Sequence, residues 1–241
     1  DFNQPINDWD VSKVTSMSSM FRGTPFNQPL SGWDVGSVTN MQLMFNYNSP
    51  FNQDIGSWNV TGVVGTPGSS NGFRSTFASN SQFNNGGSPS ISGWDVSNCR
   101  NMVAMFQNNS YFNQPIGAWD LSAGPSIYNM FDGATSFNNG GSSNISGWDV
   151  SSITSFQGLF KKTPFNQPIG YWDTSSVGGI NETFREADAF DQDLSNWNVA
   201  SVTNATNFMY NASGLSTTNY DRTLSGWSSQ SVNNGVSIHF G

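Results

Sequence analysis

The feature that most constrains this chain is a tryptophan that recurs at nearly regular intervals along its 241 residues. Each tryptophan stands three residues after an Ile or Leu, and the commonest spacing is 24 or 25 residues: Trp9, Trp33, Trp58, Trp94, Trp119, Trp148, Trp172, Trp197 and Trp227. A unit of this size cannot bury its apolar face alone, so neighbouring units must stack and share one core. We therefore expect a repeat protein whose tryptophans form a buried column.

The residues around each tryptophan predict one strand and one helix in every unit. Trp33 and Val35 are two places apart, the spacing that puts two side chains on one face of a strand. Val38, Met41 and Met44 follow at steps of three, the spacing of one face of a short helix. Each coil of about 25 residues is therefore expected to hold one short parallel strand and one short helix.

The spacing Ile6-x-x-Trp9-x-Val11 matches the core pattern of leucine-rich repeats. We therefore predict an α/β repeat fold, a right-handed leucine-rich-repeat-like solenoid. Residues 1–219 should form about eight coils. Residues 220–241 should form a partial last coil and a C-terminal capping strand, because apolar and polar residues alternate there after a turn. The first coil shows no comparable cap, so further coils upstream or end-to-end packing in an assembly are expected.

Three loops interrupt the repeat. Residues 83–87 and 137–141 both read Phe-Asn-Asn-Gly-Gly and lengthen the same turn, and residues 65–72 form a loop rich in Gly, Ser and Pro. Insertions of this kind protrude from one side of a repeat protein and often contain binding residues.

Composition narrows the possible partners. Only 10% of the residues are charged, the formal net charge is −8, and Asn, Ser and Gly supply most of the polarity. A negative chain repels nucleic acid and anionic lipid, so we expect neither as a partner and no direct membrane insertion. The uncharged polar surface is typical of secreted or cell-surface proteins. The one cysteine, Cys99, excludes an internal disulfide framework and is expected to be an inert buried thiol.

An acidic or amide residue follows almost every tryptophan, and stacking places these residues in a column. Close carboxylates repel one another unless hydrogen bonds or a cation compensate them. One interpretation is structural hydrogen bonding to the adjoining turn, in which case no cofactor is expected; the other is bound calcium, because calcium prefers oxygen ligands in irregular geometry. The candidate calcium ligands are Asp10, Asp34, Asp95, Asp120, Asp149 and Asp173.

A second column begins each coil with the pair Asn-Gln, as in Asn27-Gln28 and Asn166-Gln167. Stacked amides can bond to one another from coil to coil, which favours a structural ladder, and the alternative is a row that binds sugar. The lone His239 has neither a second His nor a Cys nucleophile near it in the sequence, so it indicates no catalytic triad and no zinc site.

Six Asn-x-Ser/Thr sequons are candidate glycosylation sites if the chain passes through a eukaryotic secretory pathway. They are Asn59, Asn108, Asn144, Asn181, Asn204 and Asn211. Several sequons are expected by chance in a chain this rich in Asn, Ser and Thr.

The recurring unit, for example residues 26–45 with Phe-Asn-Gln-Pro, Trp-Asp and Met-Phe in fixed order, resembles the repeat of BspA-like bacterial surface proteins and mycoplasma-type lipoproteins. The resemblance covers nearly the whole chain. It implies an extracellular, leucine-rich-repeat-like module with a role in adhesion, and it brings no catalytic residues with it.

We therefore expect a non-enzymatic protein at the cell surface or outside the cell, active in adhesion or as a structural component of a surface assembly or filament. Its expected partners are proteins or glycans, with self-assembly through the solenoid ends as a further possibility. The alternative hypothesis is a carbohydrate- or calcium-dependent binding module, with the Asp column or the Asn-Gly-Gly loops as its site.

Overall fold

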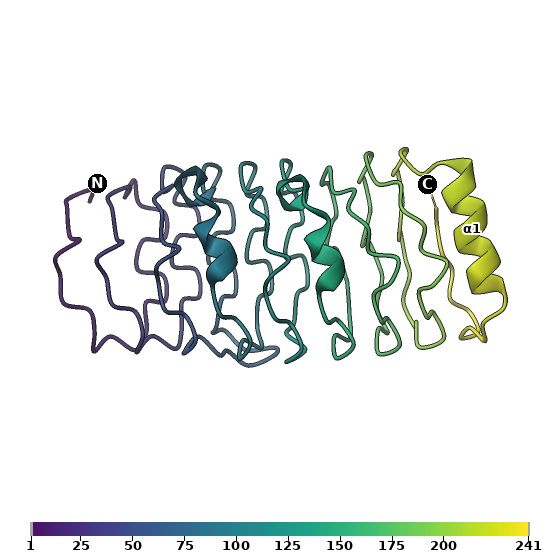
Figure 1. Cartoon of the computed structure of the whole chain (residues 1–241), viewed down its shortest axis with the longest axis horizontal. Coiled ribbons are helices and arrows are strands. Elements are labelled where there is room, and N and C mark those ends of the chain that lie inside the picture. The colour runs from purple at the N-terminus through teal and green to yellow at the C-terminus, as the bar shows by residue number, and fades with distance from the viewer. Residues whose placement is uncertain (1, 241) are drawn as a thin grey trace.

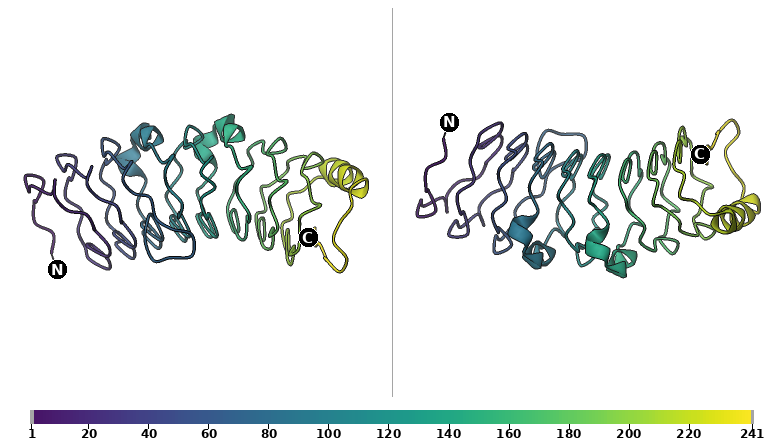
Figure 2. Two further views of the ribbon diagram at one scale, coloured as in Figure 1. Left: turned by 90° about the horizontal axis from the view of Figure 1, so that it is seen from below. Right: turned by 90° about the horizontal axis from the view of Figure 1, so that it is seen from above.

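The computed structural model describes residues 2–240, which form a long rod of stacked coils with the two chain ends at opposite ends of the rod (Figure 1). Five helices interrupt the coils: η1 (Asn85–Gly87), η2 (Pro89–Gly93), η3 (Asn139–Gly141), η4 (Ser143–Gly147) and α1 (Thr217–Ser228). The first four are 3₁₀ helices in the two insertions. They protrude on the same side of the rod, and α1 lies across its C-terminal end (Figure 2).

The predicted strand is wrong, and with it the leucine-rich-repeat solenoid with a strand and a helix in each coil. Residues 2–240 contain no strand and no sheet; β pairing is limited to isolated parallel bridges such as Ser16 with Asn40. Side chains do alternate around the tryptophan, since Trp33 and Val35 are buried and Asp34 is exposed. However, tight turns precede and follow this segment, so the chain bends before a ladder can form.

The predicted short helix is also wrong, because the segment is a run of tight turns. Leu43 within it and Tyr47 just after it have φ of 57° and 54°, values that a right-handed helix excludes. Alternate backbone N–H groups donate to the next coil at 2.9–3.1 Å: Met41, Leu43, Phe45 and Tyr47 to the carbonyls of Gly72, Arg74, Thr76 and Ala78. The spacing of the apolar residues by three or four therefore reflects consecutive turns in this chain. These turns bury Met41, Met44 and Phe45 as a helix would.

Aromatic side chains fill the core of the rod in continuous columns. Phe45 stacks on Phe51, where the next coil begins, with ring centroids 3.8 Å apart, and on Phe77 farther along that next coil at 5.5 Å. From Trp33 to Trp227, each indole N–H donates to the carbonyl of the Ile or Leu in the preceding coil at 2.8–3.2 Å. The tryptophans therefore join coils by hydrogen bonds as well as by packing.

At the C-terminal end, α1 covers the last coil. Ser216 caps the helix, because its Oγ accepts a hydrogen bond from the N–H of Asn219. The side chain of Trp227 extends from the helix and is buried in the core. The boundary predicted at 219/220 falls inside this helix. Residues 236–240 pack against the last coil, where the N–H of Met209 donates to the carbonyl of His239 at 2.9 Å, but this segment forms no strand.

Candidate functional site

A column of asparagines runs along one edge of the rod and ties each coil to the next. The Oδ1 of each member accepts a hydrogen bond of 2.7–3.0 Å from the backbone N–H at the same position of the following coil. The accepting residues are Asn3, Asn27, Asn52, Asn84, Asn113, Asn138 and Asn166. Gln53 adds a bond from its Nε2 to the Oδ1 of Asn27 at 2.9 Å, as other glutamines of the column do. These contacts are those of the structural ladder that the sequence favours.

The column continues into the C-terminal helix through Asp191, which stands where the earlier coils have Asn. Its Oδ1 accepts from the backbone N–H and the hydroxyl of Ser216 at 2.9 and 2.8 Å and from Nδ2 of Asn219 at 2.8 Å. Burial alone would raise the pKa of Asp191, but these hydrogen bonds outweigh it and hold the pKa below its ordinary value. The carboxylate thus anchors the first turn of α1 to the stack.

In the Asp column, which the sequence offers as a calcium site, each carboxylate accepts a hydrogen bond within its own turn. In each of its six members, Oδ1 accepts the backbone N–H two residues ahead at 2.9–3.1 Å: Asp10, Asp34, Asp95, Asp120, Asp149 and Asp173. Side-chain and backbone hydrogen bonds from the serine two places on lower the pKa of four of them: Asp10, Asp95, Asp120 and Asp173. Within residues 2–240, no three His, Cys, Asp or Glu side chains converge to hold a metal ion.

The sequons differ in how they are presented. Five of the asparagines are exposed: Asn59, Asn108, Asn144, Asn204 and Asn211. Asn181 is half-buried, and the hydroxyl of its Thr183 is buried and donates to the carbonyls of Phe156 and Ile180. Glycosylation stays a prediction for the five exposed sites, and the buried threonine argues against the sixth.

The first insertion builds a polar groove against the preceding coils. Asn85 is fully buried with φ of 53°; its Oδ1 accepts from the N–H of Ile55 at 2.9 Å and its Nδ2 donates to the carbonyl of Ser88 at 2.8 Å. This fixes η2 beside residues 53–57 and brings Ser90 to Asp54, whose Oδ1 accepts from the Ser90 hydroxyl at 2.7 Å. The insertion therefore shapes one wall of a groove.

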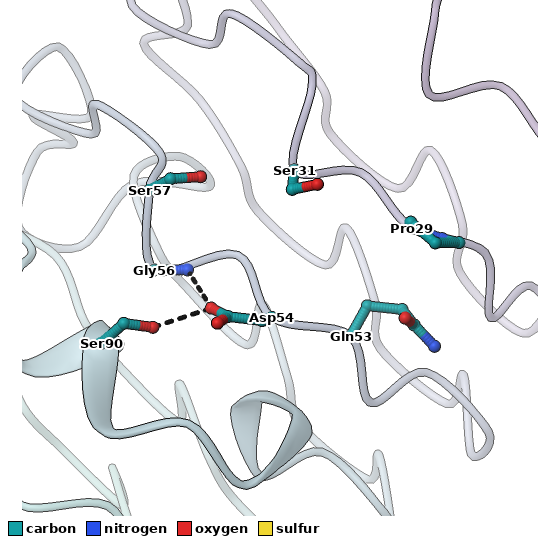
Figure 3. A pocket seen from close by; sticks show the side chains of 7 residues that line it. All are labelled: Pro29, Ser31, Gln53, Asp54, Gly56, Ser57 and Ser90. Carbon is teal, nitrogen blue, oxygen red and sulfur yellow. Dashed lines mark hydrogen bonds between the residues drawn. The ribbon is translucent and has the colours of Figure 1, made fainter.

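The groove has a volume of about 520 Å³ and is open to solvent. Figure 3 shows its lining side chains, with dashed lines joining Asp54 to the Ser90 hydroxyl and to the backbone N–H of Gly56. Its walls come from three successive coils: Pro29, Ser31, Gln53, Asp54, Gly56, Ser57 and Ser90. Burial raises the pKa of Asp54, but hydrogen bonds from Gly56, Ser90 and Asn85 outweigh this and lower it, which keeps the carboxylate ionised near neutral pH.

Sequence reasoning missed Asp54 although it carried a signal. The unit Phe51-Asn52-Gln53-Asp54 has an acid where four other coils have Pro: Pro5, Pro29, Pro115 and Pro168. Asp54 departs from the repeat and faces an insertion in the next coil. At such a position, the structural role that the repeat gives to the residue is no longer required. Cys99, by contrast, is the buried thiol that the sequence predicts, and burial raises its pKa to about 11.

In the part of the chain that the structure describes, no helix combines the length and the apolar character that crossing a bilayer requires. A family model described as "Mycoplasma protein of unknown function, DUF285" matches residues 1–68, 68–143 and 139–240 in tandem. Among curated proteins and solved structures, none matches the chain.

Proposed function

Since the chain belongs to the DUF285 family of mycoplasma proteins of unknown function, we propose that it is a non-enzymatic repeat protein of the cell surface or extracellular space, acting in adhesion or as a structural component of a surface assembly. The finer resemblance to BspA-like surface proteins is part of this proposal. Its partners would be proteins or glycans presented on a surface, or other copies of the chain.

The observation that supports this proposal most is the way polar side chains are used. The Asn column, the Asp turns and the indole N–H groups all bond within a coil or between neighbouring coils, along nearly the whole rod. Such coil-to-coil bonding makes a long, uniform scaffold whose outer face is polar and weakly charged. A repeated face of this kind suits contact with an extended partner rather than chemistry at one point.

The proposal is tested by adhesion under flow. Beads carrying the whole chain should be retained on surfaces coated with extracellular glycoprotein or with the chain itself, more strongly than beads carrying an unrelated acidic protein of equal size. Electron microscopy across a concentration series separates the two forms of the proposal, because filaments or arrays indicate a structural component and single rods indicate an adhesin. Single rods that adhere to none of these surfaces would overturn it.

The alternative, a carbohydrate-binding module, is favoured by the groove at Asp54, where free hydroxyls line an open depression. A calcium-dependent version has less support, because the Asp column already holds backbone N–H groups. We expect the melting temperature to stay within about 1 °C on addition of EDTA, since no bound ion would be removed. A fall of several degrees, reversed by added calcium, would instead establish a calcium site.

A further inference from the structure

The groove beside the first insertion presents polar atoms that the fold itself leaves unused. All three hydrogen bonds to Asp54 end on Oδ1: from Gly56 N–H at 2.9 Å, the Ser90 hydroxyl at 2.7 Å and Asn85 Nδ2 at 3.2 Å. Within the described residues, its Oδ2 and the hydroxyls of Ser31 and Ser57 make no such bond. Figure 3 shows these groups around one depression.

The groove is also held firmly in shape. Ser90 receives a hydrogen bond from Asn85 at 3.0 Å and gives one to Asp54, while Asn85 is itself buried and bonded to the backbone. Gln53, on the opposite wall, is fixed by two bonds from its Nε2 to Asn27, which leave its Oε1 to the groove. Because these side chains are already ordered, a ligand would lose little affinity to ordering them.

The chemistry of the lining selects the ligand class. The lining contains no Lys or Arg and one carboxylate, so it would repel phosphate, sulfate and acidic peptides. Calcium needs about six to eight oxygen ligands, which one carboxylate oxygen cannot supply. The hydroxyl groups of a ligand both donate and accept, so they can pair with the unused Ser31 and Ser57 hydroxyls and donate to the carboxylate. The Pro29 ring adds an apolar surface for C–H groups.

We propose that the groove formed by Ser31, Asp54 and Ser57 binds a neutral sugar unit of a surface glycan. The Asp54 carboxylate accepts from one or two sugar hydroxyls, the two serines exchange hydrogen bonds with others, and Pro29 packs against the C–H face of the ring. The volume of about 520 Å³ lies within the usual range of small-molecule sites, and its openness admits an internal unit of a longer chain. This assignment rests on the proposed adhesive function and names its ligand.

The second insertion provides a natural comparison for the groove. It repeats the scaffold of the first, with Asn139 Oδ1 accepting from the N–H of Ile116 at 2.8 Å. However, Pro115 stands where the first insertion faces Asp54, Ala118 where it faces Ser57, and Asn144 replaces Ser90. Ser92 keeps the position of Ser31, so the carboxylate and the Ser57 and Ser90 hydroxyls are what distinguish the first place from the second.

The test is a titration of the isotopically labelled whole chain with mannotetraose, cellotetraose and chitotetraose, followed by NMR. At least one probe should shift amide signals clustered at residues 29–32, 53–57 and 88–91. Ser31→Ala with Ser57→Ala should weaken that binding about tenfold. Both serines are exposed and unbonded, so the melting temperature should not change. Ser92→Ala with Ser146→Ala, the matched control outside the groove, should leave binding unchanged.

Failure of this assignment is distinguishable from failure of the adhesive function. If no probe shifts the groove signals, or if the double serine variant binds as the original does, the groove is not a sugar site. Bead adhesion of the same variant then separates the cases, because beads that still adhere leave the adhesive function standing. Groove binding by the original chain without any bead adhesion would instead reject adhesion and keep the groove.

Discussion

The two insertions, at residues 83–94 and 137–148, have one backbone design and two different surfaces. Each carries an Asn-Gly-Gly turn whose buried asparagine accepts from the backbone N–H of an isoleucine in the preceding coil, at 2.9 and 2.8 Å. Each then forms a short 3₁₀ helix that ends before a tryptophan. The side chains where the insertion meets that preceding coil differ: they are Asp54, Ser57 and Ser90 at the first and Pro115, Ala118 and Asn144 at the second. The scaffold is thus kept while the surface side chains change.

The two insertions share a buried asparagine, and replacing it should have the largest effect on stability. Asn85→Ala and Asn139→Ala each leave an isoleucine N–H without its acceptor in the buried interior, and each puts Ala at φ above 50°. We expect each to lower the free energy of unfolding by about 2–3 kcal/mol, measured by urea denaturation with tryptophan fluorescence. A large loss at one site and none at the other would show that the insertions do not share a scaffold.

The next effect concerns how closely the insertions lie on the preceding coil. A Cβ at Gly56 would stand 2.7 Å from the carbonyl carbon of Ser90, and a Cβ at Gly117 would overlap the backbone of Asn144. Gly56→Ala and Gly117→Ala should each lower the free energy of unfolding by about 1–2 kcal/mol in the same assay. Gly93→Ala and Gly147→Ala are matched controls, because a Cβ there meets nothing within 4 Å, and they should be neutral.

A smaller effect, the dependence of stability on pH, distinguishes the two insertions. The pKa of Asp54 is lowered in the folded state, so this carboxylate adds stability above its unfolded pKa, near 3.9, and that stability is lost as the pH falls through the folded pKa. Asp54→Asn should therefore lose less stability than the original chain between about pH 5 and pH 2, by under about 1 kcal/mol because the site is exposed. Identical acid unfolding curves would contradict the hydrogen bonding described for Asp54.

The sequence predicted the repeat and its core but not the secondary structure. Regular spacing of Trp33, Val35, Met41 and Phe45 identifies which side chains are buried, and they are buried. The same spacing does not say where backbone hydrogen bonds go. Here the backbone hydrogen bonds join the next coil or close a turn, and positive φ at residues such as Leu43 makes this possible. No sequence rule predicts a Leu at φ of 57°.

The candidate site was predictable only in part. The sequence marked the Asn-Gly-Gly loops as places where binding residues often lie, and Ser90, three residues after the first of these loops, lines the groove. It could not show that Ser31, Asp54 and Ser90, from three successive coils, line the same depression, because that depends on how the coils are aligned. The buried asparagines Asn85 and Asn139 were also missed, since Asn in a Gly-rich loop ordinarily indicates an exposed turn.

The most direct test exchanges the surface chemistry between the two insertions and counts binding sites by calorimetry with the tetrasaccharide that binds the original chain. One variant carries Asp54→Pro, Ser57→Ala and Ser90→Asn, and the other carries Pro115→Asp, Ala118→Ser and Asn144→Ser. Independent scaffold and chemistry predict one site in the original chain, none in the first variant and two in the second. Equal site numbers in all three proteins, or the failure of every tetrasaccharide to bind the original chain, would contradict the account.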